Sequence, residues 1–296
     1  MNQFAADRLR EAADLLEQQQ ANPFRVRAYR QASDTVASLD EDLRGILERE
    51  GMEGLEKLPA VGPRIAEAIR QMLTTGRWGQ LDRLRGTLDP EKLFRVVPGL
   101  GAELARRIHD TLHVDTLEAL ELAAHDGRLA SVPGIGVRRA AMIRAGLATM
   151  LGRFRARGPA GQEPPIEVLL DVDREYREKA AAGRLVRIAP RRFNPTGEAW
   201  LPVLHAERGD WRFTALFSNT ARAHELKRTR DWVVLYFHTD TQAEGQRTVV
   251  TETHGALAGR RVIRGLEAEC RAHYGVGAAS RTRRVGRESS PRASGP

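Results

Sequence analysis

The sequence predicts a mainly α N-terminal array of helix-hairpin-helix units, followed by a C-terminal α+β domain with an antiparallel sheet. A short apolar-Pro-small-apolar-Gly pattern recurs three times in the first half, which is typical of repeated helical hairpins. Alternating apolar runs, which favour strands, dominate the second half. A basic stretch rich in glycine and proline begins near residue 153 and separates these two kinds of sequence.

Composition limits the class of protein. The chain has 296 residues, 41% of them apolar, which is enough for two or three compact domains. Its formal net charge of +8 indicates a polyanionic partner. The single cysteine, Cys270, excludes an internal disulfide framework and a cysteine-rich zinc site. No apolar run approaches the roughly 18 residues that a bilayer requires, so we expect a cytoplasmic, nucleoid-associated protein with no membrane partner.

Each copy of the repeat has the composition of a tight turn between two helices. The copies are LPAVGPRIA from Leu58, VPGLGAELA from Val97 and VPGIGVRRA from Val132, at spacings of 39 and 35 residues. Proline ends the first helix, and glycine lets the backbone approach a ligand closely. The free N–H groups that open the second helix can then receive a phosphate oxygen without reading a base.

We therefore expect the hairpin glycines, and the arginines that follow them, to contact DNA phosphates. The expected residues are Gly62, Arg64, Gly99, Gly101, Arg106, Arg107, Gly134, Gly136, Arg138 and Arg139. In the alternative interpretation, the hairpins are packing turns between helices and bind no ligand.

The pattern along the chain predicts five segments. They are two helix-hairpin-helix domains over residues 1–85 and 86–152, a basic Gly/Pro linker over 153–164, the α+β domain over 165–275 and a disordered basic tail over 276–296. In the first segment, Asn22 is the expected N-cap of a helix with Pro23 at its first position. One face of this helix is expected to carry Phe24, Ala28, Ala32, Val36 and Leu39.

In the α+β domain the sequence predicts a helix followed by a meander of strands. The helix begins at residue 166, where the apolar residues recur at helical spacing. The expected strands are AWLPVLHAE and WRFTALF, joined by a turn at Arg208-Gly209-Asp210, and then DWVVLYFHT, QRTVVTET and RRVIRG. Short helices are expected at SNTARAHELK and LEAECRAHY.

The first 150 residues resemble the N-terminal part of the family X DNA polymerases, both bacterial and polymerase-beta-like. The matching segments, in order, are NPFRVRAYRQAS, LPAVGPRIAEAIRQMLTTGRWGQLDRL, VPGLGAELARRIHDTLHVDTLEALELAAHDGRL and VPGIGVRRAAMI. The resemblance covers about half of the chain. It implies a helical module that binds gapped or nicked DNA, with the first hairpin domain near the 5′ end of the downstream strand. It also implies a monovalent cation at the hairpins, and we expect no other cofactor.

One position departs from the lyase-competent members of that family. These members remove a 5′-deoxyribose phosphate through a Schiff-base lysine, and the alignment places Ala68 there. Alanine cannot form an imine. Arginine outnumbers lysine 43 to 4 in this chain, and the nearest lysine, Lys57, precedes the hairpin. We therefore expect that the lyase chemistry is lost.

The residues that bind the 5′-phosphate in the family are better preserved. The resemblance places them at Arg25, Tyr29 and Arg64. Arginine suits a terminal phosphate because its guanidinium can bind two oxygens at once, and a tyrosine hydroxyl adds one more donor. In the alternative interpretation, Tyr29 is a core aromatic residue of an amphipathic helix.

The second half carries few signs of an active site. Asp171 and Asp173 form a D-x-D pair, but side chains two positions apart on a helix diverge by about 200° and cannot share a metal. We expect no metal site, no catalytic residue and no polymerase palm. In the alternative, His205, His238 and Glu252 converge in space from different strands.

The sequence thus favours a non-catalytic DNA-binding protein of bacterial type. We expect it to grip the phosphate backbone without sequence preference, at gapped, nicked or 5′-phosphate ends, in DNA repair or related metabolism. Two alternatives remain open. One is a DNA-processing enzyme, of nuclease or lyase type, with its active site in the C-terminal domain. The other is a repair scaffold that recruits a repair-protein partner through that domain.

Overall fold

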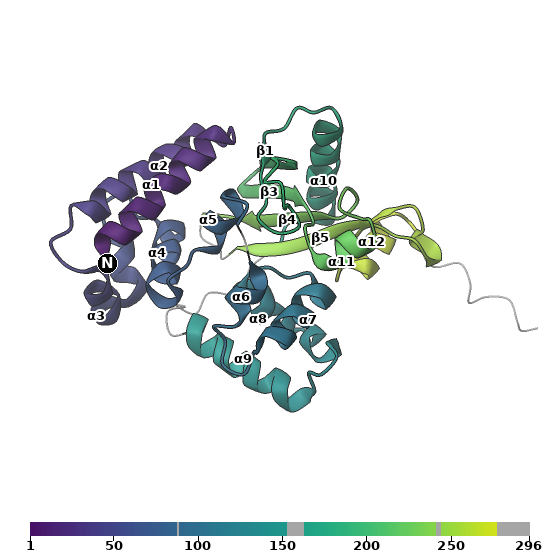
Figure 1. Ribbon diagram of the computed structural model, residues 1–296, viewed down its shortest axis with the longest axis horizontal. Helices are drawn as coiled ribbons and strands as arrows, with labels where there is room; N and C mark the ends of the chain where they lie inside the picture. Colours follow the sequence, from purple (N-terminus) through teal and green to yellow (C-terminus); the bar gives the residue numbers. More distant parts are fainter. Residues whose placement is uncertain (88, 153–162, 241–243, 277–296) are drawn as a thin grey trace, which may run out of the picture.

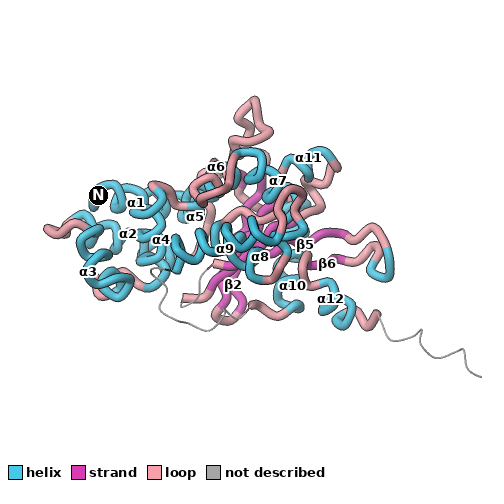
Figure 2. The backbone as a smooth tube through the Cα atoms, turned by 90° about the horizontal axis from the view of Figure 1, so that it is seen from below, coloured by secondary structure: helices cyan, strands magenta, loops and turns pink. Residues whose placement is uncertain are grey.

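The computed structural model describes residues 1–87, 89–152, 163–240 and 244–276. The expected tail and most of the expected linker lie outside the described residues. Two groups of helices and a sheet with its own helices make up the described chain (Figure 1). Seen from below, the second helical group lies in front of the sheet and the first lies to one side (Figure 2). The structure confirms the helical N-terminal half and the α+β second half with an antiparallel sheet.

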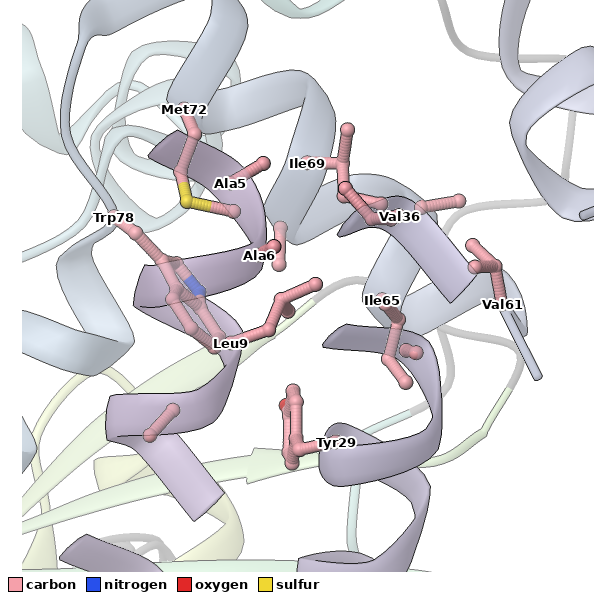
Figure 3. Close-up of a cluster of buried hydrophobic side chains, with 14 of the residues drawn as sticks. Ala5, Ala6, Leu9, Tyr29, Val36, Val61, Ile65, Ile69, Met72 and Trp78 are labelled. Carbon is pink, nitrogen blue, oxygen red and sulfur yellow. The ribbon is translucent and has the colours of Figure 1, made fainter. Parts of the chain in front are cut away.

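The first helical group has a core of its own. Its helices are α1 (Asn2–Gln18), α2 (Pro23–Ala37), α3 (Leu43–Glu56), α4 (Pro63–Thr75) and α5 (Gly79–Leu84). Leu9, Val36, Ile69 and Met72 are almost completely buried and pack together with the Trp78 ring (Figure 3). Burying such large apolar side chains stabilises the group by about 1.5–3 kcal/mol for each.

In helix α2 the structure confirms the expected start of the helix but not the whole of its expected buried face. Asn22 caps it by accepting a hydrogen bond from the Phe24 amide, and Pro23 occupies the first turn as expected. The expected place of Phe24 on the buried face is wrong, because its side chain is 77% exposed. The buried face instead runs through Val26, Tyr29 and its neighbours toward Val36, so Phe24 in the first turn lies outside it.

The second helical group follows directly. It contains α6 (Pro90–Phe94), α7 (Ala102–Leu112), α8 (Leu117–His125), the 3-10 helix η1 (Arg128–Ser131) and α9 (Val137–Gly152). Phe94, Ile108, Leu120 and Ile143 are fully buried in a core separate from the first. Each helical group therefore buries its own apolar residues around its own hairpins.

The sheet has six strands in sequence order, all antiparallel. They are β1 (Arg187–Ile188), β2 (Leu201–Arg208), β3 (Trp211–Phe217), β4 (Val233–His238), β5 (Gly245–Thr251) and β6 (Arg261–Ile263). Strands β2 and β3 form the expected hairpin, in which Arg208 pairs with Trp211. Strand β1 was not expected, since its two residues are too few to show a period in the sequence.

The two faces of the sheet pack against different partners. Helix α10 (Ile166–Ala181), which was expected, shares a core with Phe213, Leu235 and Val249 on one face. The short elements α11 (Ala221–Glu225), η2 (Gly255–Leu257) and α12 (Glu267–His273) complete the domain. The other face carries Tyr236 and polar side chains that contact the helical groups.

Candidate nucleic-acid interface

The three hairpins have the same backbone conformation. In each, the fourth residue donates an amide hydrogen bond to the first: Val61 to Leu58, Leu100 to Val97 and Ile135 to Val132, at 2.9–3.1 Å. The third residue is left-handed in all three, with φ of 60° at Ala60, 84° at Gly99 and 88° at Gly134. The repeat seen in the sequence is therefore also a repeat in the structure, even where alanine replaces glycine.

The last glycine of each hairpin opens the following helix toward solvent. Gly62 and Gly101 are the N-caps of α4 and α7, and neither helix has a side-chain cap. Gly136 precedes α9 in the same way, with its carbonyl accepting from the Ala140 amide at 3.0 Å. A Cβ added to any of these three glycines would meet nothing within 4 Å. The first-turn N–H groups thus lie at an open, electropositive helix end.

The second and third hairpins pack against each other reciprocally. A Cβ on Gly99 would lie 2.9 Å from Met142 of α9, and a Cβ on Gly134 would lie 3.0 Å from Arg107 of α7. Arg107 and Met142 hold equivalent positions, six residues after Gly101 and Gly136. This exchange of equivalent contacts relates the two hairpins by an approximate two-fold axis.

The arginines expected at these two hairpins differ in their surroundings. Arg106 and Arg107 both form ion pairs with Glu103, at 2.8 and 2.9 Å. Arg139 donates to the Gly134 carbonyl at 2.6 Å. Arg138 is exposed and has no hydrogen bond or ion pair with another residue that the structure describes.

Arg144, which lies farther along α9, is also exposed and makes no ion pair within the described chain. The sequence interpretation missed it because it lies outside the repeated motif.

The first hairpin leads into a small cavity. Arg64, Ala68 and Gln71 of α4, Arg83 of α5 and Glu244 of the sheet domain line this space of about 30 Å³. Ala68 is 4% exposed, so the position aligned with the Schiff-base lysine faces the interior.

None of the four lysines lines this cavity, and Lys57 is exposed and pairs with Glu50 at 3.4 Å. The absence of an amine from this cavity supports the expectation that lyase chemistry is lost, which stays a prediction.

Arg25 and Tyr29 lie in different surroundings on α2. The Tyr29 ring is buried against Trp78, with 5.6 Å between ring centroids, and its hydroxyl meets Gln80 at 3.5 Å. Arg25 lines a groove of about 450 Å³ between the start of α2 and strands β2 and β3. Tyr29 therefore lies in the core of the first helical group, and its contact with phosphate remains a prediction.

Arginines converge on one histidine at the end of β4. His238 is 6% exposed, and burial lowers its pKa well below the usual value. The charges of Arg64, Arg25, Arg212 and Arg83 lower the pKa further. On β2, burial together with Arg25 and Arg83 lowers the pKa of His205 to about 3. Both imidazoles are neutral near pH 7, which leaves the arginines as the cations of this region.

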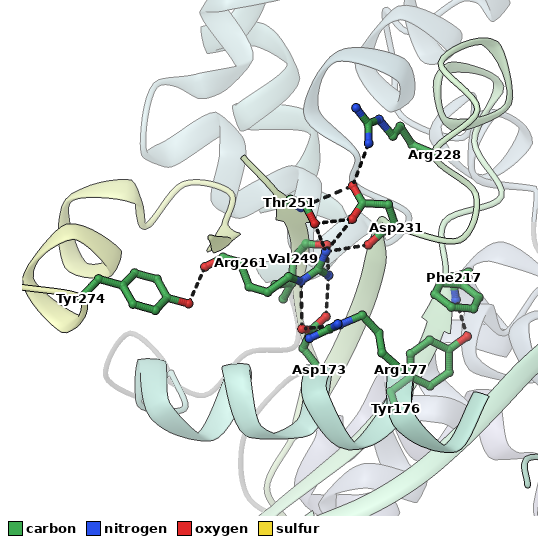
Figure 4. A network of polar contacts seen from close by, with 10 residues as sticks. All are labelled: Asp173, Tyr176, Arg177, Phe217, Arg228, Asp231, Val249, Thr251, Arg261 and Tyr274. Atoms are coloured by element: carbon green, nitrogen blue, oxygen red, sulfur yellow. Dashed lines mark hydrogen bonds and ion pairs between the residues drawn. The ribbon is translucent and has the colours of Figure 1, made fainter. Parts of the chain in front are cut away.

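The D-x-D pair is not a metal site. Asp173 is fully buried and accepts hydrogen bonds from Arg261 at 2.6 Å and Arg177 at 3.0 Å (Figure 4). Asp171 pairs with Arg174 and Arg208 instead. The two carboxylates thus diverge, as expected for a helix.

The alternative set of His205, His238 and Glu252 does not form a metal centre either. Glu252 follows β5 and pairs with Arg264 at 2.7 Å. His205 contacts Gln19 and Thr214, each at 3.1 Å. Across the described residues there is no group of three histidine, cysteine or acidic side chains that could hold a metal. Likewise, none of the described helices is long and apolar enough to cross a bilayer.

Arg83 and Glu244 are site residues that sequence reasoning missed. Their side chains form an ion pair and are only 2% and 12% exposed. They are separated by 161 residues, and no repeat or periodicity connects them. Only the docking of the sheet domain on the first helical group brings them together.

Family models match the N-terminal half of the chain. A helix-hairpin-helix domain matches residues 1–78, and a SAM-like helix-hairpin-helix tandem matches residues 52–113 and 91–149. The second match to the tandem covers the two hairpins that pack reciprocally.

Two polymerases are similar to the same half. The "DNA polymerase/3'-5' exonuclease PolX" of Bacillus subtilis is 28% identical over 162 residues, which are 53% of this chain and 25% of that protein. The "DNA polymerase IV" of Saccharomyces cerevisiae is 36% identical over 84 residues, or 28% of this chain and 14% of that protein. The matched part thus spans a quarter or less of these relatives. The resemblance to the helix-hairpin-helix region of family X polymerases is confirmed.

Proposed function

We propose that the chain binds DNA through the phosphate backbone, without sequence preference, in DNA repair or related metabolism. The observation that carries this proposal is the shared geometry of the three hairpins. Each hairpin ends in a glycine at which an added Cβ would meet no protein atom within 4 Å, and a helix begins directly after that glycine. The helices after the first two hairpins have no side-chain cap. Such a helix end binds a phosphate oxygen through backbone N–H groups and reads no base.

The reciprocal packing of the second and third hairpins suggests how duplex DNA is held. Two hairpins related by an approximate two-fold axis present the same anion site twice, and the two strands of a duplex are related in a similar way. We infer that each of these hairpins holds a phosphate of one strand. Exposed Arg138 and Arg144 add positive charge beside the third hairpin.

The first hairpin is proposed to serve the end of a strand. Arg64 follows its last glycine, and Arg25 lies on the neighbouring helix, where both act electrostatically on His238. Two guanidiniums in one region suit the double charge of a terminal phosphate. We therefore propose gapped, nicked or 5′-phosphorylated DNA as the preferred ligand.

Replacing Gly101 and Gly136 together with valine tests this function. Neither glycine has positive φ, and a Cβ at either meets no protein atom within 4 Å, so the fold should persist. The new side chains would stand between the helix starts and a phosphate. We expect affinity for gapped duplex to fall at least about tenfold, the loss of roughly one charge-assisted hydrogen bond or more. Gly45→Val, within α3, is the matched control.

The salt dependence of binding gives a second readout. Binding that neutralises several phosphates should weaken linearly with the logarithm of salt concentration, by a slope of about 0.9 for each phosphate on B-DNA. The double variant should show a shallower slope than the wild type. Wild-type affinity in the double variant, or affinity independent of salt, would show that the hairpins only pack helices.

A further inference from the structure

Arg64, the arginine of the first hairpin, already faces an anion. Glu244 directly precedes β5, and its carboxylate lies 3.8 Å from Arg64 and forms a hydrogen-bonded ion pair with Arg83. The three side chains are only 18%, 2% and 12% exposed for Arg64, Arg83 and Glu244. Arg64 lies in the first turn of α4, two residues after Gly62 of the hairpin. A side chain of the sheet domain therefore pairs with the guanidinium that the proposed function assigns to a terminal DNA phosphate.

Positive charge exceeds negative charge around this carboxylate. The side chain of Arg25 has no hydrogen bond or ion pair within the described chain, although it acts on buried His238 together with Arg64 and Arg83. Arg212 acts on His238 too, but it is paired with Asp240 at 2.7 Å. Glu67, the other carboxylate of the cavity wall, is bound to Arg70. The Glu244 carboxylate thus faces the two guanidiniums of Arg64 and Arg83, an imbalance that favours a ligand of higher negative charge.

Arg83 also has donor capacity that a carboxylate does not fill. Its guanidinium lies over the Tyr236 ring at 3.9 Å, which fixes its orientation. Its Nη1 atom is buried and has no hydrogen-bond partner among the described residues. Unfilled buried donors are rare in native proteins because they cost free energy. A phosphate monoester offers three terminal oxygens where a carboxylate offers two, so it can satisfy more of these donors.

The space beside Glu244 excludes simultaneous binding. The cavity that Glu244, Arg64 and Arg83 line has a volume of about 30 Å³. A cavity of this size holds only a few water molecules, so a phosphate group that contacts both arginines needs the room that the carboxylate now takes. The carboxylate and a phosphate must therefore take turns at the two arginines.

We propose that Glu244 is an internal competitor at the strand-end site, and that a DNA 5′-phosphate binds there by displacing this carboxylate from Arg64 and Arg83. The proposal rests on the DNA-binding function above and assigns to the sheet domain a part in choosing the ligand. A tethered carboxylate competes at a high effective concentration. A terminal phosphate, with a charge of about −1.5 to −2, can displace it, whereas an internal phosphodiester with one charge cannot.

Glu244→Gln tests the proposal because it removes the charge and keeps the shape. The probes are two gapped duplexes that differ only in a 5′-phosphate or a 5′-hydroxyl at the downstream strand. We expect the variant to bind the phosphorylated duplex at least about tenfold more tightly than the wild type does, since like-charge contact is costly. Affinity for the hydroxyl duplex should change little. Adding Arg64→Ala to Glu244→Gln should abolish the gain.

Glu207→Gln is the matched control. Glu207 lies on β2 beside the same groove as Arg25, yet it bonds Asn22 at 2.9 Å and does not pair with Arg64 or Arg83. It reports the effect of removing one nearby negative charge without opening the site. An equal gain in Glu207→Gln and Glu244→Gln would overturn the proposal, because the effect would then be general electrostatics.

A second measurement covers the case in which Glu244→Gln loses stability. Millimolar inorganic phosphate should raise the thermal midpoint of this variant by more than it raises that of the wild type, in which Glu244 competes. If both proteins bind DNA, but with the same ratio of affinities for the two duplexes and the same response to phosphate, the competitor role is wrong and the hairpin function stands. If neither protein binds either duplex, the proposed function fails and this inference fails with it.

Discussion

Tyr236 of β4 donates its hydroxyl hydrogen to the carboxylate of Asp115, in the second helical group, at 2.5 Å. Both residues are buried. The same carboxylate meets His109 at 2.8 Å, and the Asp115 amide donates to Gln246 of β5 at 2.8 Å. A buried polar network therefore fixes the sheet domain to the second helical group. The guanidinium of Arg83, from the first helical group, lies over the Tyr236 ring.

Tyr236→Phe should weaken this docking. The substitution keeps the ring under Arg83 but removes the donor to a buried carboxylate. We expect the free energy of unfolding to fall by about 1–3 kcal/mol, as for other hydrogen bonds to charged groups. Urea unfolding measures the loss. Hydrogen–deuterium exchange should show faster exchange in both α7 and β4.

Tyr274→Phe provides the comparison for that change. Tyr274 donates to the Arg261 carbonyl at 2.9 Å, within the sheet domain and away from the helical groups. Its loss should leave exchange in α7 unchanged. Equal effects of the two substitutions on α7 would contradict the role assigned to Tyr236.

The pairing of His109 with Asp115 makes the free energy of unfolding depend on pH in the alkaline range. Burial opposes protonation of His109, but two carboxylates outweigh it and raise the pKa from 6.5 to about 9. Asp110 lies 3.7 Å from Nδ1, and Asp115 is hydrogen-bonded to Nε2 at 2.8 Å. The folded state therefore holds this proton more tightly than the unfolded state. The resulting stability is complete below about pH 6.5 and is lost as pH rises through about 9. It corresponds to at most about 3 kcal/mol.

His109→Gln isolates this contribution. We expect the difference in unfolding free energy between wild type and variant to be constant below about pH 6.5 and to shrink between pH 7 and 10. Chemical denaturation at a series of pH values measures this difference. Parallel stability curves across that range would mean that His109 is not held in its protonated form.

Asp173 and Asp171 should respond very differently to substitution. Asp173→Ala removes the fully buried counter-ion of Arg261 and leaves it only the partly buried Asp231. Removing one partner of a buried ion pair typically costs about 3–5 kcal/mol, so a loss of that size is expected. Asp171 is only partly buried, with its side chain 33% exposed, and Asp171→Ala should cost less than about 1 kcal/mol. Thermal unfolding of the two variants and the wild type measures both losses of stability. A small effect at Asp173 would contradict the structural role of the buried network.

Local patterns in the sequence predicted most of the elements. The three hairpins, helix α10 and the β2–β3 hairpin were predictable because each depends on turn residues or on a period within a short segment. The contacts between domains were not. Tyr236 and Asp115 are 121 residues apart in the sequence, and Arg83 and Glu244 are 161 residues apart. These contacts can therefore be seen only once the domains are docked in the structure. The exposure of Phe24 was missed for a similar reason, because packing of α2 against its neighbours selects the buried face.

Ala60 is the one hairpin position at which the sequence departs from the glycine of the other two copies. Its φ of 60° matches 84° at Gly99 and 88° at Gly134. A residue with a side chain pays roughly 1–2 kcal/mol to adopt the left-handed conformation. Glycine avoids this cost, but part of the gain is offset because glycine loses more conformational entropy on folding. Ala60→Gly should therefore stabilise the first helical group by up to about 1 kcal/mol.

Ala102→Gly is the opposite control for this prediction. Ala102 is exposed in the first turn of α7, where glycine only adds freedom to the unfolded chain, so this change should destabilise by up to about 1 kcal/mol. Urea unfolding of the two variants and the wild type should therefore show shifts of opposite sign. The hairpin amides should keep their position in Ala60→Gly, so DNA affinity should stay at the wild-type level. Destabilisation by Ala60→Gly would show that the left-handed conformation at this turn carries no strain.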